Sequence, residues 1–406
     1  MANVKKLTRI LDKLVQVGPS YLDQTLRSYV TENKEYRLYT DYHPDSHPGG
    51  EGTANTYAIF SYFSSGIYKT EEERETDILI VAGGGGGSIG NASGGSGGGE
   101  VLEIRGAKLP AGSYVITVGA GGGGADYPLN TGNFPIATTD GRGGEGNDSR
   151  FETTSGQFPI IASGGGVGGF RQADTDPLEG GNGGGAGGSD VTDGLGLGRY
   201  VGADPTQHTT TSTYTGGTPY LDGTVVSYQN KGGDSDAYDT GNDAADSYAP
   251  GGGGGSGTAG SLGVKTRGGN GGDGISLDWV NEVFLKTYKF NGNIYWAAGG
   301  GAAGMADTEP GDGGLGGGGG GASYRSTNPT DPDSLTFWNG KGGLSGYNTG
   351  YDAAYMKGGA GGQNTGSGAG GSQSVTSAVH AQRILTKGPN GGSGFVLIRV
   401  KMNDLV

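Results

Sequence analysis

The sequence contains no cysteine and few residues of the kinds that build a large core or a membrane segment. Without cysteine the chain forms neither disulfide bonds nor thiolate metal sites. Hydrophobic residues make up only 32% of the 406 residues. No run approaches the roughly 18 apolar residues that indicate a membrane-spanning helix. We therefore expect no transmembrane helix and no large conventional cores.

Basic clusters and an export signal are also lacking. The net charge is −14, and Lys5-Lys6 is the most basic run. Because phosphate binding needs clustered lysine and arginine, nucleic acid is not expected as a partner. Arg9, Asp12 and Lys13 interrupt what would be the apolar core of a signal peptide, so we expect synthesis in a cytoplasm without export by that route.

Glycine is abundant instead. It supplies 95 of the 406 residues, whereas its ordinary usage is roughly 7%. Two interpretations compete for its runs. Glycine-rich chains are often flexible linkers. Alternatively, the runs form extended left-handed threefold helices, the polyglycine counterpart of polyproline II, which make no internal hydrogen bonds and must pair with neighbours.

Free energy decides which alternative is expected. Ordering one backbone residue costs about 1–2 kcal/mol, whereas one hydrogen bond returns only about 1 kcal/mol net. A bundle therefore forms only if nearly all glycine backbone groups are paired. Runs such as 180–188, 251–257 and 366–371 have the length of structural elements, and only small residues such as Ala, Asn and Ser interrupt them. These features favour the bundle.

Short apolar segments between the glycine runs predict strands at 56–63, 77–82, 100–105, 113–119 and 394–400. Asn291-Gly292 predicts a hairpin that joins 283–290 to 294–298. We expect Ile78–Val81 and Val396–Val400 to lie in one small sheet that closes the domain. The predicted fold is thus mostly β and irregular, with short strands framing a bundle of polyglycine-II-type helices.

A short α-helical region is predicted at the N-terminus. Leu7, Ile10, Leu11 and Leu14 lie on one helical face, and Gly18-Pro19 ends the helix. Such a short helix needs a partner. The predicted organisation is a helical attachment or oligomerisation region at 1–40, a β-containing connector at 41–76, and a glycine-rich domain at 77–400 with inserted loops 189–250 and 322–357.

The order of strands and glycine runs resembles a known family. The segments 78–87, 112–124 and 391–399 are similar to the glycine-rich domain of phage tail fibre and tail-tip proteins, which include adhesins. The resemblance implies a virion protein of the phage tail that takes part in host attachment. Its implied partners are other tail proteins and a host cell-surface glycan or outer-membrane component. The alternative is a purely structural decoration, collar or baseplate part.

Oligomeric state has two alternatives as well. A homotrimer assembled through the N-terminal stripe is expected, because phage fibres resemble trimers in design. The other possibility is a monomer seated on another fibre protein.

Candidate receptor-binding residues come from the two inserts. Tyrosine offers a large contact area at low entropic cost, and small polar residues adapt their hydrogen bonds. In the alternative, these tyrosines pack over the glycine bundle and shield it. The candidates are Tyr214, Tyr220, Tyr228, Tyr238, Trp338, Asn339, Tyr347, Tyr351 and Tyr355.

Catalysis, cofactors and metals are not expected. Gly94–Gly98 matches the G-x-S-x-G nucleophile pattern, but chance explains it in so glycine-rich a chain, and a hydrolase also needs a histidine and an acid. The weaker metal alternatives are His43 with His47 and the acidic loop 234–246. That loop lacks the central glycine and terminal glutamate of a calcium loop.

Overall fold

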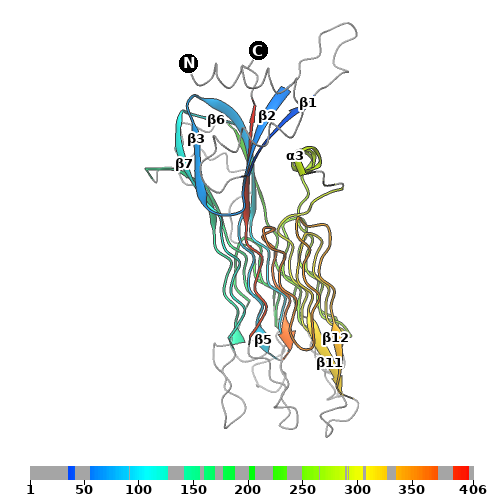
Figure 1. The fold of residues 1–406 in the computed structure, drawn as a ribbon. Coiled ribbons are helices and arrows are strands. Elements are labelled where there is room, and N and C mark those ends of the chain that lie inside the picture. The colour runs from blue at the N-terminus through cyan, green and yellow to red at the C-terminus, as the bar shows by residue number, and fades with distance from the viewer. Residues whose placement is uncertain are drawn as a thin grey trace.

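The structure is a computed structural model. It describes residues 35–41, 55–90, 92–126, 141–155, 160–169, 177–187, 201–205, 223–235, 249–264, 266–288, 290, 292–304, 308–326, 335–373 and 387–401. Within these residues the molecule is elongated (Figure 1). Most long strands and the helix lie at one end, which we call the proximal end. The short strands β5 (Ile89–Gly90), β11 (Ala322–Ser326) and β12 (Leu335–Asn339) lie at the other, distal end.

A six-stranded antiparallel sheet dominates the proximal end. Its order is β1-β2-β14-β4-β6-β10. The strands are β1 (Glu35–Asp41), β2 (Asn55–Tyr62), β14 (Phe395–Lys401), β4 (Arg74–Val81), β6 (Val101–Leu109) and β10 (Thr224–Tyr228). The expectation that Ile78–Val81 and Val396–Val400 share a sheet is confirmed, because the two strands are direct neighbours. The last strand of the chain thus lies inside the sheet, between β2 and β4.

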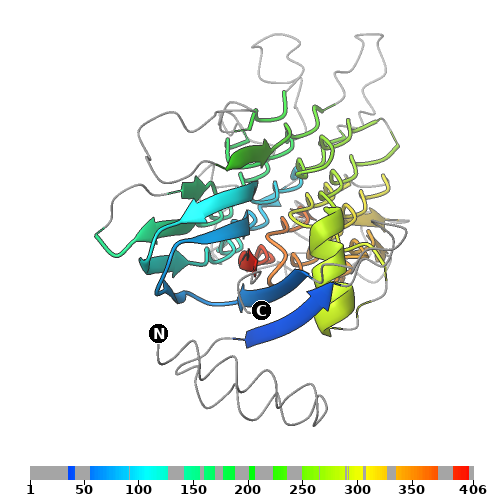
Figure 2. The same cartoon turned by 90° about the horizontal axis from the view of Figure 1, so that it is seen from above.

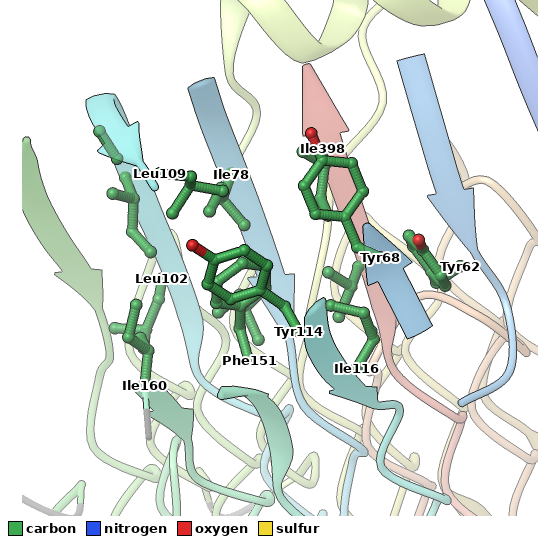
Figure 3. Packing of buried hydrophobic residues seen from close by; sticks show 14 of the residues in the cluster. Tyr62, Tyr68, Ile78, Leu102, Leu109, Tyr114, Ile116, Phe151, Ile160 and Ile398 are labelled. Carbon is green, nitrogen blue, oxygen red and sulfur yellow. The ribbon is translucent and has the colours of Figure 1, made fainter. Parts of the chain in front are cut away.

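A second, four-stranded sheet packs on one face of the first. It consists of β3 (Gly66–Thr70), β7 (Gly112–Thr117), β8 (Ser149–Thr153) and β9 (Ile160–Ala162). Ile78, Ile80 and Ile398 of the first sheet meet Ile116 and Phe151 of the second in a buried cluster (Figure 3). Burying each such side chain stabilises the fold by about 1.5–3 kcal/mol.

The opposite face of the six-stranded sheet is buried by the helix α3 (Asp278–Tyr288). Successive side chains of β4 point to opposite faces of the sheet. Ile78 and Ile80 pack against the second sheet, while Leu79 and Val81 pack on the helix side. Viewed from above, β14 lies near the middle of the proximal end, with α3 to one side (Figure 2).

The predicted hairpin around Asn291-Gly292 is wrong in its first strand. Most of 283–290 belongs to α3, and Asn291 itself lies outside the described residues. Val280, Val283 and Phe284 are fully buried and follow helical i, i+3, i+4 spacing. Packing of this stripe against the sheet overrides the local turn signal.

The glycine runs pass between the two ends and are hydrogen-bonded to one another. Along 83–87, the first three N–H groups donate to three different neighbouring segments. The fourth and fifth N–H groups donate to the first and second of these segments again. The acceptors in order are the carbonyls of Asn147, Gly392, Gly97, Gly144 and Pro389. The run is buried throughout. These runs are therefore a packed array rather than free linkers.

Close backbone approach explains why the array uses glycine. A Cβ atom added at Gly85 or Gly253 would lie well within 3.0 Å of a neighbouring carbonyl oxygen, a separation that real Cβ atoms do not show. Gly123 is an exception, because a Cβ there would meet no atom within 4 Å. At most positions in the runs the array therefore excludes any side chain.

The predicted segment boundaries differ from the structure in several places. Residues 1–34 lie outside the described residues, but 35–41 form β1, so the helical region cannot extend to residue 40. β2 and β3 pair with β14 and β7, and β4 crosses the predicted boundary at 76/77. The insert 189–250 supplies the edge strand β10, and 322–357 supplies β11 and β12. Such long-range pairing leaves no local trace in the sequence.

Candidate functional site

The distal end carries a two-stranded hairpin rich in aromatic residues (Figure 1). In the register of β11 and β12, Tyr324 lies opposite Phe337 and Ser323 opposite Trp338. Directly opposed residues share a face of the ladder, so the two pairs lie on opposite faces. Ser323 is fully buried, and its hydroxyl donates to the carbonyl of Thr308 at 2.6 Å. The side chain of Ser323 therefore lies against the protein, whereas Trp338 opposite it is half-buried.

A tight turn packs beside the other face of this hairpin. Ala354 and Lys357 exchange two backbone hydrogen bonds, which makes Tyr355 and Met356 the central residues of a two-residue turn. Met356 is 4% exposed and Tyr355 is 72% exposed. The Tyr355 ring meets Phe337 edge to face, with centroids 5.4 Å apart. The turn thus presents one aromatic ring to solvent and supports it with another.

Polar groups surround this aromatic pair. Asp352 accepts a hydrogen bond from the N–H of Gly342 and pairs with the ammonium of Lys341 at 3.4 Å. Both charged side chains are more than half exposed. Tyr351 and Asn339 are exposed beside them. We call Phe337, Asn339, Lys341, Tyr351, Asp352 and Tyr355 the distal aromatic surface. Its chemistry suits binding by ring stacking and hydrogen bonding.

Two predicted receptor residues lie elsewhere. Tyr347 stacks on Phe63 and Trp296, and Tyr228 packs against the same helix-side cluster. The hydroxyl of Tyr228 donates to Glu103 at 2.8 Å. Burial, together with this hydrogen bond and the charge of Glu103, raises the pKa of Tyr228. For these two residues the packing alternative describes the structure.

The remaining predicted residues divide into two groups. Trp338, Asn339, Tyr351 and Tyr355 lie on or beside the distal hairpin and its neighbouring turn. The others lie outside the described residues, and they are Tyr214, Tyr220, Tyr238 and the N-terminal stripe of Leu7, Ile10, Leu11 and Leu14.

A buried charge network at the proximal end escaped the sequence analysis. The Arg399 guanidinium lies 2.6 Å from an Asp77 oxygen and 4.8 Å from the ring centroids of both Tyr57 and Trp279. Burial alone would raise the pKa of Asp77. The hydrogen bond from Gly106 and the positive charges of Arg399 and Arg105 outweigh burial and hold the pKa below its usual value.

The predicted strand pairing contained a signal for this network. Asp77 and Arg399 stand directly opposite each other on β4 and β14, and both interrupt apolar runs. Opposite charges facing each other across a predicted strand pair indicate an ion pair. The network joins the first strand of the glycine-rich region to the last strand of the chain.

A second buried carboxylate links three distant segments. Glu100 is fully buried and accepts hydrogen bonds from the Ser227 hydroxyl at 2.6 Å and the Gln229 amide at 2.7 Å. It also accepts from the N–H of Ser163 at 2.8 Å. All three partners are donors, which compensates the burial of the carboxylate. Glu100 therefore serves to join β6, β10 and the segment after β9.

The described residues include only part of the weaker chemical alternatives. Ser96, the serine of the G-x-S-x-G match, is fully buried and donates to the carbonyl of Gly86 at 2.8 Å. No group of three potential metal ligands occurs within the described ranges. His43, His47 and residues 236–246 lie outside those ranges.

Asp234, at the start of the acidic loop, pairs with Lys231 and accepts the N–H of Gly202. Among the described residues, no helix has the length and apolar character needed to span a membrane.

The comparisons with known proteins identify the family of the glycine-rich region. No curated protein matches the sequence. A family model described as a glycine-rich domain matches residues 63–277, which is just over half of the 406-residue chain. The matched region begins just after β2 and ends just before α3, so it covers the whole four-stranded sheet, strands β4, β6 and β10 of the six-stranded sheet, and the first glycine runs. The chain belongs to this glycine-rich domain family.

Proposed function

We propose that this chain is a non-enzymatic structural protein of a bacteriophage particle, a tail fibre or tail-tip component that contacts the host cell through its distal end. The observation that carries the proposal is the division of the molecule into two ends. Conventional packed sheets lie at one end, and exposed aromatic and polar side chains lie at the other. Binding residues are commonly held on loops that a rigid scaffold positions.

The rigid scaffold is, in this proposal, a bundle of polyglycine-II-type helices. The supporting observation is the return of hydrogen bonds to the same neighbouring segment after three residues, as in 83–87. Three residues per turn without internal hydrogen bonds is the geometry of that helix. The bundle holds the distal end in a fixed position relative to the proximal end, because each segment is hydrogen-bonded to several neighbours.

Attachment to the particle is assigned to the proximal side and the N-terminal region. Leu7, Ile10, Leu11 and Leu14 form the stripe through which we propose a homotrimer, or a seat on another tail protein. The network of Asp77 and Arg399 stiffens the sheet at this end. The expected partners are tail proteins here and a host surface component at the distal end.

The test is competition for host cells by the purified protein. Wild-type protein should adsorb to host cells and block infection by the phage, and Tyr351→Ala with Tyr355→Ala, which removes the two exposed tyrosines of the distal aromatic surface, should weaken both effects. Ile67→Ala is the matched control, because Ile67 is 42% exposed on the proximal strand β3. Adsorption by none of these proteins would favour the purely structural alternative, and particle imaging that places the chain outside the tail would reject the proposal.

A further inference from the structure

The turn at Ala354–Lys357 uses a residue that its backbone disfavours. Tyr355 has a φ of 57°, and Met356 is not among the residues with positive φ. A two-residue hairpin turn with positive φ only at its first central position is of the type that normally has glycine there. Positive φ is a genuine outlier for a bulky side chain.

Glycine serves this purpose elsewhere in the same chain. Gly106, Gly292, Gly316, Gly317 and Gly366 have positive φ, and the other described non-glycine residues with positive φ are smaller than tyrosine: Ala92, Ala297, Ser345 and Asn364. In a chain with 95 glycines, a tyrosine at such a position indicates that the ring itself is required. Strained residues of this kind concentrate at ligand-binding sites.

Folding does not account for the ring. Tyr355 is 72% exposed, whereas its neighbour Met356 is buried and its carbonyl accepts the N–H of Gln373. The turn is therefore anchored through Met356. The ring of Tyr355 gains only an edge contact with Phe337.

The groups around the ring define what it would bind. Ala353 and Met356 are buried while the residues between them are exposed, so burial repeats every three residues. Asp352 lies three residues before Tyr355, and both side chains are exposed. Asp352 pairs with Lys341, and Asn339 is exposed on the adjacent strand.

This surface has a flat ring next to a neutral pair of strong hydrogen-bonding groups. The face of an aromatic ring is electron-rich and attracts C–H groups that carry partial positive charge. A sugar ring offers such C–H groups on one face and hydroxyls at its edge. A protein partner usually needs a patch of about 800 Å² with an apolar centre, which an isolated ring among exposed polar side chains does not supply.

We propose that Tyr355 is the stacking residue of a carbohydrate-binding site, in which Asp352, Lys341 and Asn339 bind the sugar hydroxyls. The inference rests on the proposed function and assigns a host-surface glycan, rather than a surface protein, as the ligand. The backbone strain at Tyr355 is retained for the sake of this contact.

The experiment uses the full chain and two matched substitutions. Tyr355→Gly removes the ring and relieves the strain, and Ser345→Gly relieves a similar strain at an exposed residue with φ 60° outside this surface. Neither variant should unfold at a lower temperature than wild type. The probe is an immobilised panel of purified bacterial lipopolysaccharides and capsular polysaccharides that includes those of the host.

We expect wild type, Ser345→Gly and Tyr355→Phe to bind the same polysaccharide with similar affinity. Tyr355→Gly should bind this polysaccharide with an affinity at least about tenfold lower, as when a central aromatic contact is truncated. Unchanged binding by Tyr355→Gly would overturn the inference, and so would a lower unfolding temperature, since the ring would then be structural. Adsorption of wild type to host cells without binding to any polysaccharide would overturn the glycan assignment alone, and failure to adsorb would overturn the proposed function too.

Discussion

The glycine array makes a sharp prediction about two substitutions that look equivalent in the sequence. Gly85→Ala places a methyl group against the carbonyl of Gly166. That carbonyl cannot move aside freely, because it accepts the N–H of Gly97 and the N–H of Gly166 donates to Asn182. Gly123→Ala places the same group where no atom lies within 4 Å.

Two effects of opposite sign on stability decide the outcome of each substitution. Overpacking costs typically about 1–3 kcal/mol, and more when the neighbour is fixed backbone. Replacing glycine by alanine also restricts the unfolded chain, which stabilises the folded state by about 0.4–1 kcal/mol where the backbone permits. We expect Gly85→Ala to lower the free energy of unfolding by about 2 kcal/mol or more. Gly123→Ala should be neutral or stabilising by up to about 1 kcal/mol.

Equilibrium unfolding in urea measures the difference, and thermal scans at one fixed rate replace it if unfolding is irreversible. Circular dichroism should first establish that both variants fold. Equal stabilities would refute the reasoning, because flexible linkers tolerate alanine at either position. A destabilised Gly123→Ala would show instead that another chain covers this face.

Three further predictions follow from the proximal end. Asp77 has a lowered pKa, so its ionised form contributes stability that is fully present above the usual value of 3.8 and is lost as the pH falls through the folded-state pKa. Asp77→Asn should therefore lower stability at pH 7 by up to about 3 kcal/mol and flatten the acid limb of a stability-versus-pH curve, and an unchanged acid limb would contradict the assigned role. Phe395→Ala should cost about 3–5 kcal/mol in urea unfolding, because the side chain is fully buried against Trp296, and a loss below 1 kcal/mol would contradict that packing. Cleavage at a protease site inserted within 374–386 should leave the C-terminal fragment bound during gel filtration, because β14 is buried between β2 and β4, and a released fragment would contradict the sheet order.

The sequence by itself determined the local elements whose signals are strong. Apolar runs at 77–82 and 394–400 are strands because β-branched and aliphatic residues fill a sheet that is buried on both faces. The glycine runs are packed because only a backbone without Cβ permits such close approach. Composition alone selected the aromatic residues near 338 and 355 as binding candidates, and of these Tyr351 and Tyr355 are exposed.

Tertiary structure decided the rest, because the deciding contacts join residues far apart in the chain. The segment 278–288 is a helix since its apolar stripe meets the six-stranded sheet, against the local turn signal. Tyr228, Tyr347, Tyr351 and Tyr355 were all selected from the inserts by the same criterion, yet the first two pack against the helix-side cluster and the last two face solvent. Burial depends on which segments become neighbours, and in this chain many neighbouring segments are joined by backbone hydrogen bonds between glycines, which carry no side-chain code.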